Sequence, residues 1–251
     1  MPSKTIIQAD IMAYLAETVF TETQAVVASI PDAAELPNSA REPWKKWFCE
    51  VADAILARVH PHAPVMFYQS DVRHEGLWID KAFFVQQAAE RAGFSLLSHR
   101  IVCRRPAGTA TFGRSTYSHM LLFSQTLRNS QKHGYSDVIP NGGPAAWVRG
   151  IGLHSCEAIV RMIQQESKST TLVHLFSGKG LLLEVAREKG MDVIGVDLSK
   201  KQCRAAQRFD LNKFRAAQAE RAETPADQSG LVPTPAAVVS QRNESSNTSE
   251  S

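Results

Sequence analysis

Val173 to Asp197 reads VHLFSGKGLLLEVAREKGMDVIGVD, and more of the fold follows from these residues than from any others in the chain. The apolar start fits a buried strand, Gly178 and Gly180 fit a tight turn, and the residues after them repeat apolar side chains at helical spacing. Gly190 ends that helix, and a second short apolar strand ends at Asp197. The segment therefore predicts one strand–turn–helix–strand unit, about the length of the βαβ modules that hold nucleoside-containing cofactors.

Glycine at the two turn positions lets the chain bend sharply and leaves no side chain to block a ligand against the strand end. Asp197 follows Gly178 by 19 residues, at the tip of the next strand, where a carboxylate can accept hydrogen bonds from both hydroxyls of a ribose. Leu183 replaces the third glycine of a dinucleotide site, and Lys179 lies outside any Walker pattern. The spacing favours a nucleoside ligand without a pyrophosphate; the alternative is a helix cap and βαβ turn without a ligand.

Residues 176–180 (FSGKG) and 195–199 (GVDLS) resemble motifs I and II of the S-adenosylmethionine-dependent methyltransferases, in the version found in amino-methylating DNA and RNA enzymes. The match covers about thirty residues directly. The resemblance implies S-adenosyl-L-methionine as the cofactor, with Asp197 on its ribose. The cofactor-binding residues that it implies in this half of the chain are Phe176, Ser177, Gly178, Gly180, Asp197 and Leu198.

The cofactor unit comes near the end of the folded region, so upstream elements must complete the sheet. Apolar patterns predict strands at 5–8, 24–29, 64–69, 94–103 and 117–124, and helices that begin at 11 or cover 43–58, 80–91 and 156–165. Together they predict an α/β fold, a Rossmann-like seven-strand doubly wound sheet. The order is that of a circularly permuted sheet, as is known among the amino-methyltransferases of DNA that the chain resembles.

Three parts of the chain follow from this order. Residues 1–215 form the methyltransferase domain, in which 1–130 are the catalytic and target half and 131–215 the cofactor-binding half. Residues 216–251 are rich in Ala, Ser, Pro, Gln, Asn and Glu, with almost no large apolar side chain, which predicts a disordered tail.

The resemblance extends to the N-terminal half. By it, Asp10 takes the place of the acid that contacts the adenine ring, and 29–32 (SIPD) the place of the catalytic [DNS]-P-P-[YF] tetrapeptide. Ile30 replaces the first proline and Asp32 the stacking aromatic, so Asp32 is expected to act as a general base or to hold an amine or hydroxyl. The alternative is that Asp32 and Glu35 form a capping box for the next helix. The candidate catalytic residues are Ser29, Pro31 and Asp32.

Three other segments supply candidate substrate contacts. Arginines and an aromatic between 104 and 114 could hold phosphates and stack on an unpaired base, or could belong to a solvated hairpin. A Trp and an Arg before the predicted helix at 156–165 could touch cofactor or substrate, although a Trp that packs under a Gly-rich loop is the alternative. Asp71 follows a predicted central strand and could contact substrate or cap a helix. The candidate substrate-binding residues are Asp71, Arg105, Phe112, Arg114, Trp147 and Arg149.

Composition sets the remaining limits. A length of 251 residues with 43% hydrophobic content can bury one sizeable core, and a net charge of +3 is only a mild basic bias. The sequence shows neither an apolar run that could span a bilayer nor an N-terminal signal segment, so a soluble cytoplasmic protein without a membrane partner is expected, or a nuclear one in a eukaryote. The four cysteines are far apart, which argues against a structural zinc, and no metal is expected.

These patterns predict an enzyme that transfers a methyl group from S-adenosyl-L-methionine to a nucleic acid, RNA slightly before DNA, at a nitrogen. No cysteine lies beside the predicted catalytic turn, which disfavours covalent carbon methylation. The alternatives are a methyltransferase of a small molecule or protein, and an inactive cofactor-binding module that supports an RNA-processing partner. A nicotinamide oxidoreductase is disfavoured by the missing third glycine.

Overall fold

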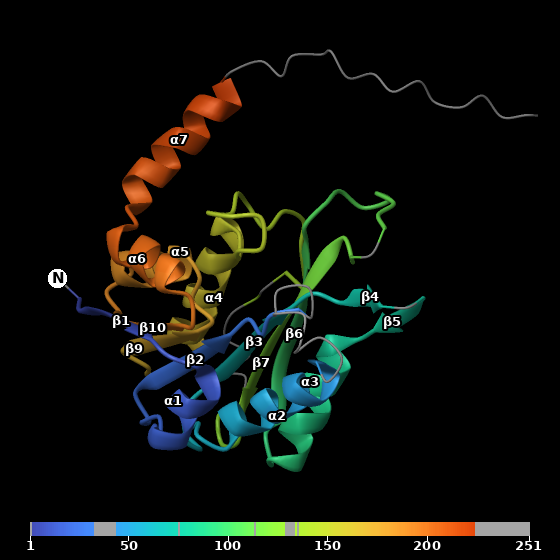
Figure 1. Cartoon of the computed structure of the whole chain (residues 1–251), viewed down its shortest axis with the longest axis vertical. Helices are drawn as coiled ribbons and strands as arrows, with labels where there is room; N and C mark the ends of the chain where they lie inside the picture. Colours follow the sequence, from blue (N-terminus) through green and yellow to red (C-terminus); the bar gives the residue numbers. More distant parts are fainter. Residues whose placement is uncertain are drawn as a thin grey trace, which may run out of the picture.

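The computed structural model describes residues 2–32, 44–74, 76–112, 114–128, 134 and 136–223. Its centre is an eight-stranded sheet in the order β1-β10-β9-β2-β3-β7-β6-β8, and a two-stranded hairpin, β4–β5, lies apart from it (Figure 1). The strands are β1 Lys4–Gln8, β2 Gln24–Ala28, β3 Val65–Gln69, β4 Val72–His74, β5 Leu77–Ile79, β6 Ser95–Cys103, β7 Tyr117–Ser124, β8 Val138–Ile139, β9 Thr171–Leu175 and β10 Asp192–Asp197.

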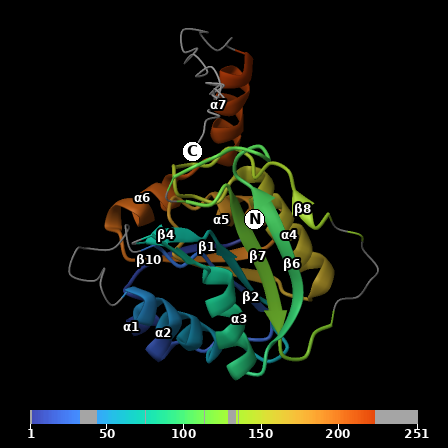
Figure 2. The same ribbon diagram turned by 90° about the vertical axis from the view of Figure 1, so that its right-hand side faces the viewer.

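The sheet confirms the permuted order. β1, the first strand of the chain, pairs in parallel with β10, the last, and their register sets Gln8 opposite Asp197. The five strands from β1 to β3 are parallel, whereas β7 is antiparallel to both β3 and β6. Figure 2 shows β6 and β7 side by side, with the two-residue strand β8 beyond β6. All seven predicted strands are present, and β8 is an addition that the sequence pattern is too short to reveal.

Helices cover both faces of the sheet, as a doubly wound fold requires. The helices are α1 Ile11–Glu17, α2 Trp44–Leu56, α3 Lys81–Arg91, α4 Leu153–Glu166, α5 Leu181–Glu188, α6 Lys200–Arg208 and α7 Leu211–Glu223. α1, α2 and α3 pack on one face with Val26 and Val173, and α4 and α5 on the other with Val27 and Leu172. Neighbouring residues of one strand thus serve opposite cores, so the central strands read as continuous apolar runs.

Besides β8, four features depart from the sequence predictions. The hairpin β4–β5 was not predicted, because strands of three residues are shorter than the pattern can resolve. The helix predicted at 156–165 is longer, because α4 begins at Leu153. α6 was also not predicted. The predicted tail start at 216 falls inside α7, which continues to Glu223 and extends away from the sheet in both views (Figures 1 and 2).

The remaining part of the predicted tail, 224–251, lies outside the described residues, as do Glu35 of the predicted capping box and the boundary at 130–131 between the predicted halves. Among the described residues, the helices are all too short or too polar to cross a bilayer.

Candidate functional site

One cavity of about 910 Å³ opens at the carboxyl ends of the parallel strands, which is where ligands bind in doubly wound sheets. It runs from the turn after β9 to the loop between β6 and β7. Most of the predicted site residues line it: Asp10, Ser29, Pro31, Asp32, Arg105, Phe112, Arg114, Trp147, Arg149, Phe176, Ser177, Gly178, Asp197 and Leu198. The structure therefore brings together residues that are far apart in the sequence. Gly180 and Asp71 do not reach the cavity wall.

At one end of the cavity, the turn between β9 and α5 is held by the carboxylate of Asp197. The Gly178 amide donates to Oδ2 of Asp197 over 2.9 Å, and the Ser199 amide donates to its Oδ1 over 2.8 Å. Every second residue of the turn from 176 to 180 has a left-handed backbone conformation, with φ of 61° at Phe176, 55° at Gly178 and 81° at Gly180. A carboxylate oxygen accepts more than one hydrogen bond, so Asp197 keeps acceptor capacity toward the cavity.

Gly180 contributes to this turn through packing instead of through contact with a ligand. A Cβ at Gly180 would lie 3.0 Å from Cβ of Ala206 in α6, and a Cβ at Gly178 would lie 3.1 Å from Nε1 of Trp147. Trp147 thus packs against the glycine turn, as in the alternative that the sequence left open, and it also lines the cavity, so a contact with cofactor or substrate stays a prediction. Asp10 lies near the same end of the cavity and caps α1 by accepting from the amides of Met12 and Ala13.

Two buried polar side chains in this part of the wall have no protein partner among the described residues. Both ring nitrogens of His174, and Oγ of Ser177, are without a hydrogen bond. Burial lowers the pKa of His174 to about 3, so its ring is neutral near pH 7. Buried polar groups are normally paired, and a ligand with amino and carboxylate groups would supply these partners. With the carboxylate of Asp197 beside the glycine turn, this end of the cavity, called the cofactor end below, is suited to a ligand that carries a ribose.

The turn 29–32 lies beside that end and is fixed at each of its last three residues. The amide of Gln69, in the orientation that satisfies both groups, donates to the Ile30 carbonyl over 3.1 Å and accepts from its amide over 2.8 Å. The indole of Trp44 donates to the Pro31 carbonyl over 3.0 Å. Ser29 precedes these residues and lines the cavity.

Asp32 is a buried ion-pair partner, 6% exposed. Its Oδ1 accepts from Nζ of Lys81 and its Oδ2 lies 3.1 Å from Nη2 of Arg114. Lys81 is itself only 2% exposed. Because each carboxylate oxygen already faces a cation, Asp32 is poorly suited to remove a proton from a substrate. The expectation of a general base at Asp32 is therefore replaced by that of a fixed anchor.

The far end of the cavity is basic. Lys81, Arg104, Arg105 and Arg114 all line it, and Arg104 donates to Oγ of Ser70 over 3.2 Å. The side chain of Phe112 is fully exposed at the same end. Positive charge beside an exposed aromatic side chain is the combination that holds single-stranded nucleic acid, by phosphate contact and base stacking. The structure brings Arg105, Phe112 and Arg114 together at this end, and their contact with a substrate stays a prediction. The sequence also offered Lys81 as a substrate contact, but its ion pair with Asp32 was not predicted, because no spacing rule connects the two residues.

Asp71 fits the second of its two predicted roles, a helix cap, and not the first, a substrate contact. It is 1% exposed and is not part of the cavity wall. It accepts hydrogen bonds from the Lys81 amide over 3.0 Å and from Nε2 of His119 over 3.0 Å. Burial opposes its ionisation, but the hydrogen bond from His119 holds the pKa of Asp71 below its ordinary value. Its visible role is to fix the start of α3, which carries Lys81.

No family model and no curated protein sequence matches the chain. Solved structures do match. TTHA0409 of Thermus thermophilus, assigned as a DNA modification methylase and complexed with S-adenosyl-L-methionine, is 17% identical with a TM-score of 0.63, over 86% of this chain and 93% of that one. The cytosine-N4-specific PvuII DNA methyltransferase is 13% identical with a TM-score of 0.63, over 87% and 94%.

A third match is the complex of M1.HpyAVI with SAM, at 12% identity and a TM-score of 0.56 over 82% of this chain and 98% of that one. These proteins share nearly their whole length with the chain but few of its residues, so the likeness concerns the fold. The protein therefore has the fold of these methyltransferases, as its permuted sheet and its resemblance to motifs I and II predicted.

Proposed function

We propose that the protein is an S-adenosyl-L-methionine-dependent methyltransferase that acts on an amino nitrogen of a nucleic acid. One observation carries the proposal: a single cavity joins a nucleoside-type site to a fixed turn at 29–32 and then to a basic end with an exposed aromatic side chain. The sequence favoured RNA slightly, but the matched structures whose substrate is named act on DNA. DNA is therefore the first acceptor to test, with RNA second.

The residues at the cofactor end fit the proposed cofactor part by part. Asp197 would accept hydrogen bonds from the ribose hydroxyls, as its position at the tip of β10 allows. Asp10, two residues beyond β1, would lie toward the adenine. His174 and Ser177 would pair with the amino and carboxylate groups of the methionine part, which would satisfy their buried polar atoms. When bound, the cofactor supplies an electrophilic methyl group on a sulfonium.

The protein's own contribution is positioning. Alkylation by a sulfonium needs the acceptor nitrogen in line with the methyl group and water kept away, which a preformed cavity provides. Gln69 and Trp44 hold the backbone of the turn at Ile30 and Pro31, and Lys81 with Arg114 holds Asp32. Ser29, the lining residue before these fixed positions, is assigned the role of accepting a hydrogen bond from the acceptor's amino group. No acid–base step is assigned to Asp32.

The basic end would hold the acceptor. Two cations around one carboxylate leave a positive excess at Lys81, Asp32 and Arg114, and Arg104 and Arg105 add to it. Such a surface attracts phosphates regardless of base sequence. Phe112 would stack on an unpaired base, which an enzyme that modifies an exocyclic amine must first bring out of the helix.

A second candidate is a cofactor-binding module without transferase activity. It is favoured by the engagement of the Pro31 carbonyl by Trp44 and of both Asp32 oxygens by cations, because these groups are the ones expected to orient an acceptor. Under this alternative, the cofactor binds but no methyl group moves.

Titration calorimetry with S-adenosyl-L-methionine, with its demethylated product and with NADH tests the cofactor. We expect the first two to bind, and Asp197→Ala to weaken binding at least tenfold, because the ribose hydroxyls lose a charged acceptor. Asp192→Ala is the matched control, since Asp192 lies at the opposite end of β10 and pairs with Ser3. Binding of NADH alone, or equal binding by both variants, would contradict the proposal.

Methyl transfer is tested by incubating the protein with cofactor that carries a radiolabelled methyl group, together with separate DNA, RNA, protein and metabolite fractions. Label in DNA or RNA, located in a methylated exocyclic amine by mass spectrometry, supports the proposed function. Label only in protein or metabolites shows a different acceptor class. Tight cofactor binding without label in any fraction supports the inactive module.

A further inference from the structure

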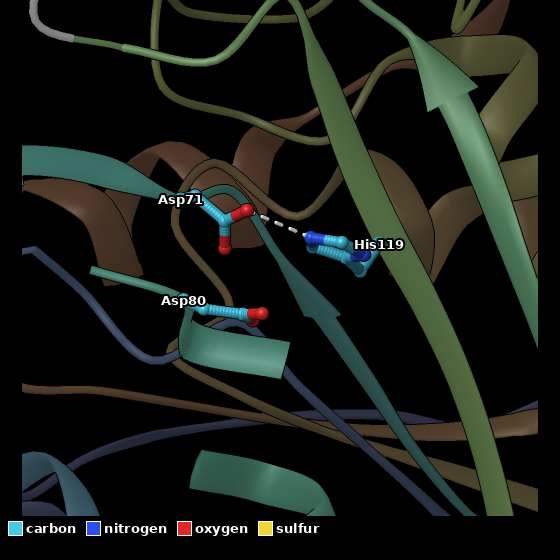
Figure 3. A group of neighbouring side chains, drawn as sticks. All are labelled: Asp71, Asp80 and His119. Atoms are coloured by element: carbon cyan, nitrogen blue, oxygen red, sulfur yellow. Dashed lines mark hydrogen bonds and ion pairs between the residues drawn. The ribbon is translucent and has the colours of Figure 1, made fainter. Parts of the chain in front are cut away.

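Three potential ligand side chains lie close together near the start of α3 (Figure 3). Asp71 follows β3, Asp80 precedes α3, and His119 lies on β7. One oxygen or nitrogen atom from each lies within 4.8 Å of the other two. None of the three lines the cavity, so this group is separate from the proposed active site.

One distance in the group suits a common ion. Oδ2 of Asp71 is 3.0 Å from Nε2 of His119. Ligand atoms bound to one transition-metal ion at about 2.0–2.2 Å are separated from each other by about 3 Å. The same distance suits a direct hydrogen bond between the two side chains, so the third ligand decides the matter. Figure 3 shows Asp80 directed toward the space shared by Asp71 and His119.

Each side chain is also held in place by another group. Nδ1 of His119 is 2.9 Å from Nε2 of His99, Oδ1 of Asp71 accepts from the Lys81 amide, and Oδ1 of Asp80 accepts from the Phe83 amide. Without a metal, Nε2 of His119 carries the proton and donates to Asp71. A metal that replaces this proton would bind the Nε2 lone pair, and His119 would then carry its proton on Nδ1 and donate it to Nε2 of His99. Metal-binding histidines are typically oriented in this way by a partner on the second nitrogen.

We propose that Asp71, Asp80 and His119 bind a divalent transition-metal ion such as Zn²⁺, with His99 as the group that orients His119. One imidazole with two carboxylates is a donor set that suits Zn²⁺ better than Mg²⁺ or Ca²⁺, which prefer oxygen alone. Asp71 and His119 are buried and Asp80 is exposed, so an ion can enter from the Asp80 side. The cysteine spacing that argued against zinc does not bear on these ligands.

The ion would connect the end of β3 with β7 and with the start of α3. That helix begins with Lys81, whose side chain holds Asp32 in the turn 29–32. The site would thus be structural, and it would stiffen the support of the basic end without touching cofactor or acceptor. Its existence does not depend on the proposed methyl transfer.

The test uses the full chain without an affinity tag, treated with a chelator and then dialysed. We expect calorimetry to show one equivalent of Zn²⁺ bound, with a rise in Tm, and Mg²⁺ to give neither. Asp80→Asn is the main variant, because Asn also caps helices and the substitution therefore removes a ligand while it keeps the cap. It should weaken Zn²⁺ binding at least tenfold, and His119→Gln should do the same.

Two control variants keep the result specific. Asp53→Asn removes an exposed carboxylate that pairs with Arg91 at the other end of α3, and His62→Gln removes an exposed histidine that bonds Thr126. Both should bind Zn²⁺ as the unaltered protein does. Circular dichroism should show that Asp80→Asn is folded, so the test does not depend on the folding of His119→Gln. Absence of stoichiometric Zn²⁺ binding, or wild-type affinity in Asp80→Asn, would overturn the proposal.

Discussion

The two ends of the cavity are built in different ways. At the cofactor end, the turn is held by residues that are close in sequence. The principal hydrogen bond joins the Gly178 amide to Asp197, within one strand–turn–helix–strand unit. At the basic end, Asp32, Lys81 and Arg114 come from three separate segments and are joined by side-chain ion pairs. A local backbone unit has a characteristic residue spacing that can be recognised in the sequence. Ion pairs between distant segments have no such spacing.

The largest expected change in the free energy of unfolding comes from a substitution at the basic end of the cavity. Lys81→Met leaves the carboxylate of Asp32 buried without its principal cation, which should lower the free energy of unfolding by about 3–5 kcal/mol. Arg114→Met should cost about 1 kcal/mol or less, because the Arg114 side chain is 35% exposed and Lys81 still pairs with Asp32. Urea unfolding at pH 7 measures both.

A double variant, Asp32→Asn with Lys81→Met, tests whether the unpaired charge of Asp32 causes the loss of stability in Lys81→Met. Removing both charges should restore much of the stability that Lys81→Met loses, since no buried charge is then unpaired. Equal destabilisation by Lys81→Met and the double variant would show that packing of the Lys81 side chain, and not its charge, holds the turn.

At the cofactor end, the expected effect is a loss of folding stability at low pH. The pKa of His174 is about 3 in the folded protein and about 6.5 when unfolded, because burial disfavours the charged ring. The unfolded chain therefore binds a proton that the folded chain does not, and the stability present above pH 6.5 is lost as the pH falls toward 3. Between pH 7 and pH 5 the loss from this residue is about 2 kcal/mol.

His174→Gln removes this titration, so the free energy of unfolding of the variant should change less between pH 7 and pH 5 than that of the unaltered protein. Urea unfolding at the two pH values measures the difference. Other titrating groups are common to both proteins and cancel in the comparison. Parallel pH dependences would mean that the pKa of His174 is nearly the same in the folded and the unfolded protein, so that burial does not keep the ring neutral between pH 7 and pH 5.

The same contrast explains what could be predicted from the sequence. The seven main strands followed from apolar runs, and the cofactor end followed from Gly178, Gly180 and the spacing to Asp197. The basic residues Arg105 and Arg114 were chosen for their charge, which a surface loop displays in the sequence. The ion pair of Asp32 with Lys81 was not foreseen, because it depends on how the start of α3 packs against the turn 29–32.

The sequence left two roles open for Asp71 and gave none to His174, for a related reason. Asp71 follows a central strand, where a ligand contact is common, but in the structure it is buried, does not line the cavity, and bonds the Lys81 amide and His119. His174 lies inside an apolar strand, where its ring looks like one more core side chain until the lack of any partner for its nitrogens becomes visible. Sequence periodicity reports which face is buried, and not which buried polar group lacks a partner.

The smallest expected effect on stability belongs to Phe112, and it separates folding from binding at the basic end. Its side chain is fully exposed, so Phe112→Ala should change the free energy of unfolding by less than about 0.5 kcal/mol. If Phe112 stacks on an unpaired base, the same variant should weaken binding of a single-stranded oligonucleotide by about 1–3 kcal/mol, as measured by fluorescence anisotropy. Val19→Ala, at an exposed apolar residue that does not line the cavity, should alter neither quantity. Unchanged oligonucleotide affinity in Phe112→Ala would leave the arginines as the only support for nucleic acid at this end, and the salt dependence of binding would then have to account for nearly all of the affinity.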